Sequence, residues 1–74
     1  MIKAFDKIVL TRNIPSKGLE KGDIGTVVFI HGNYEVYEVE FFTLEGVTRS
    51  VETLKSSDVR AVKANEVAHA RGIV

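Results

Sequence analysis

Few side chains in this 74-residue chain have the type and spacing that chemistry requires. The two histidines, His31 and His69, lie far apart in the sequence, and the chain contains no cysteine. A structural zinc site needs about four nitrogen, sulfur or oxygen ligands held close together. The sequence therefore predicts no metal site and no cofactor, and His31 is expected to be a solvated turn residue.

Glu38 and Glu40 are the nearest approach to a catalytic pair, because two carboxylates about 5–9 Å apart perform glycoside chemistry. They alternate with apolar residues, which places both on one face of a strand, roughly 7 Å apart. The same alternation is typical of any half-exposed strand. A chain this short also leaves little room for a pocket of the usual ~300 Å³. The serines lie in no nucleophile motif, so we expect no enzymatic activity.

The charges cancel overall but are unevenly distributed. Ten basic and ten acidic residues give no general positive field, so nucleic acid is an unlikely partner. Residues 31–52 carry five glutamates against Arg49 alone, between two mildly basic ends. This acidic stretch either complements the rest of the domain or contacts a basic partner.

The composition also bears on location. The absence of cysteine fits a reducing compartment. Charged residues stand near the start, where a signal peptide needs an apolar run. The longest apolar run, residues 27–30, is too short to span a membrane. We expect a cytoplasmic protein without membrane contact.

Glycines mark the points where the chain must turn. Gly22 and Asp23 supply turn chemistry just before an apolar β-branched run, and Gly46 suits the positive-φ position of a three-residue hairpin loop. Gly25, just inside the apolar run, predicts either a bulge or a close approach of another chain segment.

Five short strands are predicted from period-two alternation and turn residues, at 5–10, 24–30, 34–42, 47–54 and 59–62. The register of the third is ambiguous, so it has a bulge near Val36-Tyr37 or begins at Tyr37. The core should contain Val27, Val39, Phe41 and Val51, among others. The pattern predicts an all-β fold, a small five-stranded SH3-like barrel over residues 1–62. An OB-type barrel is the alternative, although it is usually longer and often has a helix between the third and fourth strands.

Residues 63–74 differ in character from the barrel. Asn65 is a suitable N-cap and Gly72 a suitable stop, so this tail is predicted to be a short C-terminal helix or a flexible segment. About two turns of helix are not stable alone in water. The tail is therefore docked, paired with another chain, or frayed.

Phe42 directly follows Phe41, so the two rings should point to opposite faces of their strand. If Phe41 lies in the core, Phe42 lies outside, where the tail or a partner covers it. The predicted partner contact consists of Phe42, Glu38, Glu40, Val67 and Ile73. The simplest partner is a second copy in a two-fold dimer.

Two motifs carry a family resemblance: Gly-Asp-Ile-Gly-Thr-Val-Val at 22–28 and Tyr-Glu-Val-Glu-Phe at 37–41. With them, residues 2–62 resemble a family of short bacterial proteins known only as a domain of unknown function. The resemblance implies a stand-alone SH3-like barrel and no particular activity. Pieces of both motifs are also similar to microtubule-binding glycine-rich barrels and to ribosome-associated KOW motifs. The first group's basic groove motif is absent, and KOW barrels usually carry more Lys and Arg.

The sequence therefore favours a non-enzymatic interaction module that associates with itself or binds a protein partner. Two alternatives stay open. One is a KOW-like barrel that contacts RNA or the ribosome. The other is an antitoxin-like protein that binds a basic partner through its acidic third strand, which contains Glu38 and Glu40.

Overall fold

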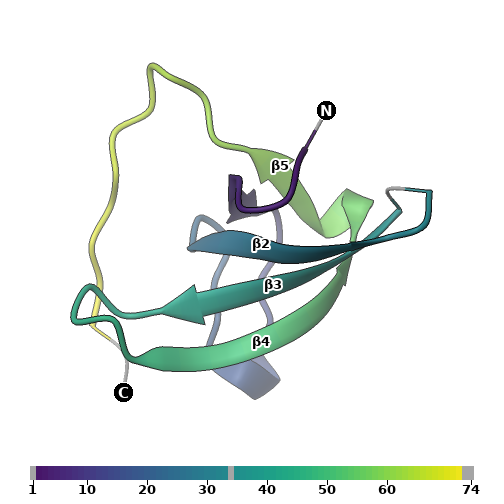
Figure 1. Cartoon of the computed structure of the whole chain (residues 1–74). Helices are drawn as coiled ribbons and strands as arrows, with labels where there is room; N and C mark the ends of the chain where they lie inside the picture. Colours follow the sequence, from purple (N-terminus) through teal and green to yellow (C-terminus); the bar gives the residue numbers. More distant parts are fainter. Residues whose placement is uncertain (1, 34, 73–74) are drawn as a thin grey trace.

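The computed structural model describes residues 2–33 and 35–72, which form one five-stranded antiparallel sheet (Figure 1). The strands are β1 (Lys7–Leu10), β2 (Ile24–His31), β3 (Val36–Phe42), β4 (Thr48–Lys55) and β5 (Val59–Ala61). Two single 3₁₀ turns, η1 (Pro15–Lys17) and η2 (Ser56–Asp58), interrupt the connections. The predicted all-β class with five strands is confirmed, and within the described residues no helix is long and apolar enough to cross a membrane.

The sheet runs in the order β4-β3-β2-β1-β5, so β1 pairs with both β2 and the last strand. No ladder joins β4 to β5 in residues 2–33 and 35–72, and the predicted barrel is therefore not closed. The long loop between β1 and β2 is ordered by a bridge between Ile14 and Leu19. Leu19 is buried in the core, so this loop is part of the packed domain.

The register shifts lie away from the place that the sequence suggested. The third strand begins at Val36 and pairs without a shift through Tyr37. One shift lies in β2, between Val27 and Phe29, and another lies at the end of β3, between Phe41 and Phe42. The extra residues are Val28 in β2 and Arg49 in β4, and an extra residue increases the local twist of its strand.

The core joins residues from all five strands and the first loop. Its buried members are Ile8, Leu10, Leu19, Val27, Tyr37, Val39, Phe41, Leu54 and Val59. Val51 was expected there, but it is 53% exposed. Leu54 pairs with Tyr37, and because side chains alternate along a strand, this register turns Val51 outward, opposite Glu40.

Gly25 is a point of close approach, and the alternative of a bulge is not observed there. It pairs with Ile8 without a shift. A Cβ atom at Gly25 would lie 2.5 Å from Val39 Cγ1 and 2.9 Å from Phe41 Cε1. The missing side chain thus lets two core side chains of β3 lie against the backbone of β2.

Positive φ angles mark the turns. Gly22 has φ 96° before β2, and Gly46 has φ 88° in the β3–β4 hairpin, where its N–H donates to the Thr43 carbonyl at 2.8 Å. Phe5 is the only non-glycine residue with positive φ among the described residues, at 71°. Its N–H donates to the Val27 carbonyl at 2.6 Å, and the Val27 N–H donates to the Asp6 carbonyl at 2.9 Å. Phe5 and Asp6 therefore both oppose Val27, as in a bulge whose first residue is left-handed.

Residues 63–74 were predicted to form either a short helix or a flexible segment, and the part of this tail that the structure describes contains no helix. Residues 62–72, called here the C-terminal segment, contain one turn and otherwise lack regular structure. Glu66 closes that turn, accepting from the Lys63 N–H at 2.6 Å while its own N–H donates to the Lys63 carbonyl at 3.1 Å. Arg60 binds the same carboxylate through two nitrogens. These side-chain contacts favour a single turn over a helix too short to be stable alone.

Candidate functional site

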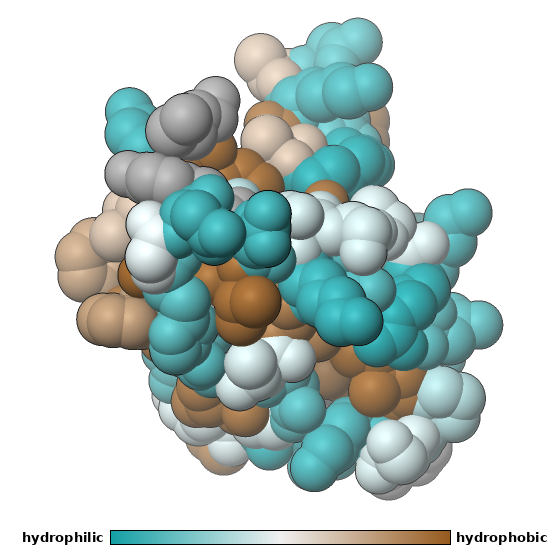
Figure 2. Space-filling model, turned by 90° about the vertical axis from the view of Figure 1, so that its right-hand side faces the viewer, coloured by the Kyte–Doolittle hydropathy of each residue, from teal (hydrophilic) through white to brown (hydrophobic). Residues whose placement is uncertain are grey.

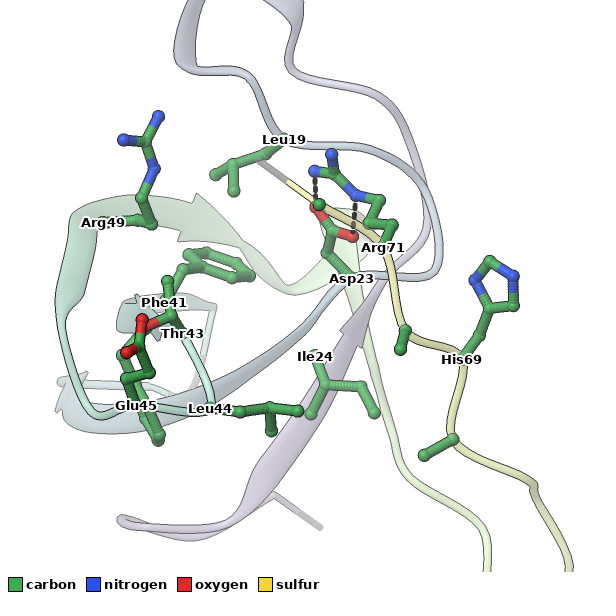
Figure 3. A pocket seen from close by; sticks show the side chains of 14 residues that line it. Leu19, Asp23, Ile24, Phe41, Thr43, Leu44, Glu45, Arg49, His69 and Arg71 are labelled. Carbon is green, nitrogen blue, oxygen red and sulfur yellow. Dashed lines mark hydrogen bonds and ion pairs between the residues drawn. The ribbon is translucent and has the colours of Figure 1, made fainter. Parts of the chain in front are cut away.

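An open groove of about 590 Å³ lies between the start of β2, the β3–β4 hairpin and the C-terminal segment. We call it the hairpin groove (Figure 3). Its lining residues are Leu19, Asp23, Ile24, Phe41, Phe42, Thr43, Leu44, Glu45, Arg49, Ala68, His69, Ala70, Arg71 and Gly72. It is larger than the short chain led us to expect, because the C-terminal segment arches away from the sheet before it returns beside the hairpin (Figure 1).

The walls of the groove are largely apolar. Leu19 and Phe41 are buried and belong to the core, whereas Ile24 and Phe42 are each more than two-fifths exposed. Leu44, in the hairpin loop, is fully exposed and points toward Ile24 across the groove (Figure 3). Apolar side chains that remain in water beside a concave surface are typical of a contact site.

An ion pair closes one end of the groove. Arg71 donates from Nε to Asp23 Oδ1 at 2.8 Å and from Nη2 to Asp23 Oδ2 at 2.6 Å (Figure 3). It also donates to the Gly18 carbonyl at 2.8 Å and lies 3.6 Å from a Glu20 carboxylate oxygen. The hydrogen bond from Arg71, together with one from the Glu20 N–H, holds the pKa of Asp23 below its usual value. The pair fastens the far end of the C-terminal segment to the start of β2.

The opposite side of the groove carries charges on the β3–β4 hairpin. Glu45 lies in the hairpin loop and Arg49 in β4. Neither side chain takes part in an ion pair with another described residue. The groove therefore offers one cation and one anion whose charges are free to meet those of a ligand.

Glu38 and Glu40 lie on one face of β3, as predicted, but neighbouring side chains already occupy their carboxylates. Glu38 accepts from Thr53 Oγ1 at 2.7 Å and lies 2.6 Å from His31 Nε2. The hydrogen bond with His31, and then that from Thr53, lowers the pKa of Glu38. Glu40 accepts from Thr48 Oγ1 at 2.6 Å. Each carboxylate is thus tied into cross-strand contacts within the sheet.

Phe42 lies beside the hairpin groove and also contacts a cation. The ammonium group of Lys7 lies 5.4 Å from the centroid of its ring, and Lys7 donates to Thr26 Oγ1 at 2.7 Å. The ring is 44% exposed. A cation at this distance from a ring is an attractive contact, so Lys7 covers part of the ring that faces away from the core.

Only some of the residues predicted to contact a partner lie close together in the structure. Phe42 lies with residues 68–72 around the groove, which places the tail beside it. Val67 is 93% exposed on the arch of the C-terminal segment, and Ile73 lies outside the described residues. The pairing of Asp23 with Arg71 was missed, because nothing local in the sequence links two positions 48 residues apart. Leu44 was also missed, although an apolar residue in a turn is a signal that could have been used.

The side of the molecule with the β2–β3 hairpin looks different. Figure 2 shows that apolar surface reaches solvent there in small areas separated by hydrophilic residues. Within residues 2–33 and 35–72, no three His, Asp or Glu side chains come together as metal ligands. The hairpin groove is therefore the feature that combines a hollow, exposed apolar side chains and free charge.

Comparison with known proteins adds a family. Neither the curated proteins nor the solved structures contain a match to this chain. A model of a protein family described as a domain of unknown function (DUF4926) matches residues 4–61. This range holds all five strands and ends where the C-terminal segment begins. The chain belongs to this family of domains of unknown function.

Proposed function

We propose that this protein is a non-enzymatic interaction module, and that the hairpin groove is where it binds a protein partner. The observation that carries the proposal is the grouping of Ile24, Phe42 and Leu44 around one open hollow. Leu44 makes the strongest case, since a fully exposed leucine in a polar loop gains nothing for the folded monomer. Burying one leucine side chain contributes about 1.5–3 kcal/mol, which a partner can recover on binding.

The charge distribution favours a protein over RNA as the partner. Three of the four arginines, Arg12, Arg60 and Arg71, are bound to carboxylates within the domain. They are therefore less available for phosphate groups, which are the main source of nucleic-acid affinity. The occupied carboxylates of Glu38 and Glu40 likewise weaken the case for an acidic face that binds a basic protein.

A matched pair of substitutions tests the proposal. Leu44→Asp places a charge in the groove, whereas Phe29→Asp places one at another exposed apolar residue, 56% exposed on β2. The wild type and both variants are used as bait in native extract from the source cells, and captured proteins are quantified by mass spectrometry. We expect at least one protein to be retained by the wild type and by Phe29→Asp and lost with Leu44→Asp.

Light scattering on the same three proteins tests the self-associating form of the proposal. If the partner is a second copy, the wild type is a dimer near 100 μM, because an interface of about 1,200 Å² or more usually holds at that concentration. Leu44→Asp should then dissociate this dimer. If all three baits capture the same proteins and the wild type is monomeric, the groove is not the contact site. Circular dichroism confirms that each variant is folded.

A further inference from the structure

We propose that Gly18, Glu20 and Asp23 form a receptor for the arginine side chain of an extended segment of a partner protein, and that Arg71 occupies it in the free chain. We call these three residues the arginine receptor. The inference rests on the proposed function and names the chemistry of the ligand that would enter the hairpin groove from this end.

The receptor offers an arginine several acceptors at once. Asp23 presents both carboxylate oxygens, Gly18 a backbone carbonyl, and Glu20 a second carboxylate. A planar guanidinium matches such a set because it donates in fixed directions, two of them parallel to a carboxylate. The side chains of Arg71 and Asp23 are only 22% and 18% exposed, so water competes less for these bonds than at a fully exposed pair.

Contacts within the family domain hold the receptor in place. The Glu20 N–H donates to Asp23 Oδ2 at 2.8 Å, and the Asp23 N–H donates to the Glu20 carbonyl at 2.9 Å. The Gly18 N–H donates to the Pro15 carbonyl at 3.1 Å, and Ile14 and Leu19 form a bridge next to it. None of these contacts involves the C-terminal segment. The receptor is therefore built by the domain itself and does not need Arg71 to shape it.

The arginine that fills the receptor comes from outside that domain. The family match ends at residue 61, and Arg71 lies ten residues beyond. Every residue from 61 to 70 is exposed, and the described backbone of 67–72 makes no hydrogen bond to the domain. Arg60 holds the segment at Glu66. Beyond Glu66, among the residues that the structure describes, only the Arg71 side chain fastens the segment to the domain by hydrogen bonds and ion pairs. Another segment that carries an arginine could make the same bonds.

The native occupant indicates the form of the ligand. Ala68 and Ala70, which precede Arg71, lie along the groove in an extended stretch and leave it unfilled. A ligand segment of the same kind, extended and with an arginine, places that arginine in the receptor. The residues before the arginine then lie beside Ile24 and Leu44. The ligand must displace Arg71, whose effective concentration through a short flexible linker is in the millimolar range. The wild-type chain should therefore bind such a ligand more weakly than a chain without Arg71.

The experiment uses a capped, fluorescently labelled peptide with the sequence of residues 66–72, Glu-Val-Ala-His-Ala-Arg-Gly. Anisotropy titrations measure its binding to the full chain carrying Arg71→Ala, to the wild type, and to the double variant Arg71→Ala with Asp23→Asn. A control peptide carries Gln in place of Arg. We expect the Arg71→Ala chain to bind the arginine peptide about tenfold more tightly than the Gln peptide. The wild type should bind the arginine peptide at least about threefold more weakly than the Arg71→Ala chain does, and the double variant should no longer bind it.

Equal binding of the two peptides, or equal binding by the wild type and Arg71→Ala, overturns the proposal. A second measurement does not depend on any variant: titration of the wild type with the peptide should shift the backbone NMR signals of Glu20 and Asp23. Shifts confined to other regions contradict the receptor. If the wild type is a dimer and Arg71→Ala dissociates it, the receptor is a contact between two copies of the chain, and this outcome also overturns the proposal. Leu44→Asp tests the apolar groove and Asp23→Asn the receptor, so the two proposals can fail separately.

Discussion

Gly25 occupies the most restrictive position in the sheet. The core side chains of Val39 and Phe41 lie where its side chain would be. A β-branched residue there must displace them or move β2, and overpacking of this kind costs about 1–3 kcal/mol or more. At residue scale, one missing methyl group therefore sets how closely β2 and the inner side chains of β3 approach.

We predict that Gly25→Val lowers the melting temperature by about 10 °C or more, since 1 kcal/mol corresponds to roughly 4–8 °C in a domain of this size. Gly72→Ala is the matched control, because a Cβ atom there meets nothing within 4 Å and the residue has no positive φ. Thermal unfolding followed by circular dichroism measures both. A change of less than a degree for Gly25→Val would show that the close approach is not a constraint.

Phe5 shows the opposite situation, a large side chain where glycine would fit better. Its φ of 71° is unfavourable for an aromatic residue, and its ring is 74% exposed, so the ring contributes little burial. We predict that Phe5→Gly is more stable than Phe5→Ala by about 1 kcal/mol, because only Gly relieves the left-handed strain. Urea unfolding of both variants checks the difference. If Ala proves as stable as Gly, the backbone at residue 5 is not strained in solution.

At the scale of elements, η2 fixes the path from β4 to β5 through Asp58. This carboxylate accepts from Arg12 Nε at 2.8 Å and from the Lys55 N–H at 3.1 Å. The hydrogen bond from Arg12 is the main cause that lowers the pKa of Asp58. A carboxyl group whose pKa is lower in the folded state than in the unfolded chain stabilises the fold. This stabilisation is complete at pH values above the pKa of the unfolded state, about 3.9, and is lost as the pH falls through the pKa of the folded state.

We therefore predict a melting temperature that is nearly constant from about pH 7 to pH 5 and falls below about pH 4. Asp23 contributes in the same direction, since its pKa is also lowered. Asp58→Asn should reduce the slope below pH 4 and lower stability at pH 7. Thermal unfolding between pH 2 and pH 7 tests this. A slope that is unchanged in the variant would assign the acid sensitivity to other carboxyl groups.

The positions of the strands could be predicted from the sequence. The side of the sheet to which each β4 side chain points could not, and neither could the conformation of the C-terminal tail. Alternation and glycine turns located all five strands to within a few residues. In β4 both faces carry apolar residues, so the choice between Val51 and Leu54 depends on pairing with Tyr37, which is a tertiary contact. The hairpin groove depends on Asp23 meeting Arg71, and no local pattern predicts a contact that distant.

The whole molecule divides into a packed domain and a segment fastened at its ends. Residues 61–70 are all exposed and no residue from 63 to 72 belongs to the core, so deleting the tail from residue 63 onward leaves the described core side chains in place. The pairs lost, Arg60 with Glu66 and Arg71 with Asp23, are partly exposed, and ion pairs of this kind contribute little to stability. We predict that the truncated chain stays folded, with a melting temperature lower by at most about 5–10 °C.

Circular dichroism and calorimetry on the truncated chain check this prediction. Loss of cooperative unfolding would show that the C-terminal segment belongs to the folding unit. Replacing Arg71 alone, with Arg71→Ala, serves as the control. It releases the far end of the segment while leaving the remaining residues in place, and it separates the effect of the ion pair from that of the chain.

The position of β1 between β2 and β5 has a consequence for how the protein is made. Ile8 leaves the ribosome early, but one of its two neighbouring strands contains Ala61, which is synthesised near the end of the domain. Until then β1 has an open edge, and Leu10 lacks its partner Val59. The sheet can form from β1 to β4 during synthesis, yet it cannot be completed until β5 has left the exit tunnel. Open strand edges pair readily with other chains, so the nascent chain is most exposed to aggregation in the interval before β5 emerges.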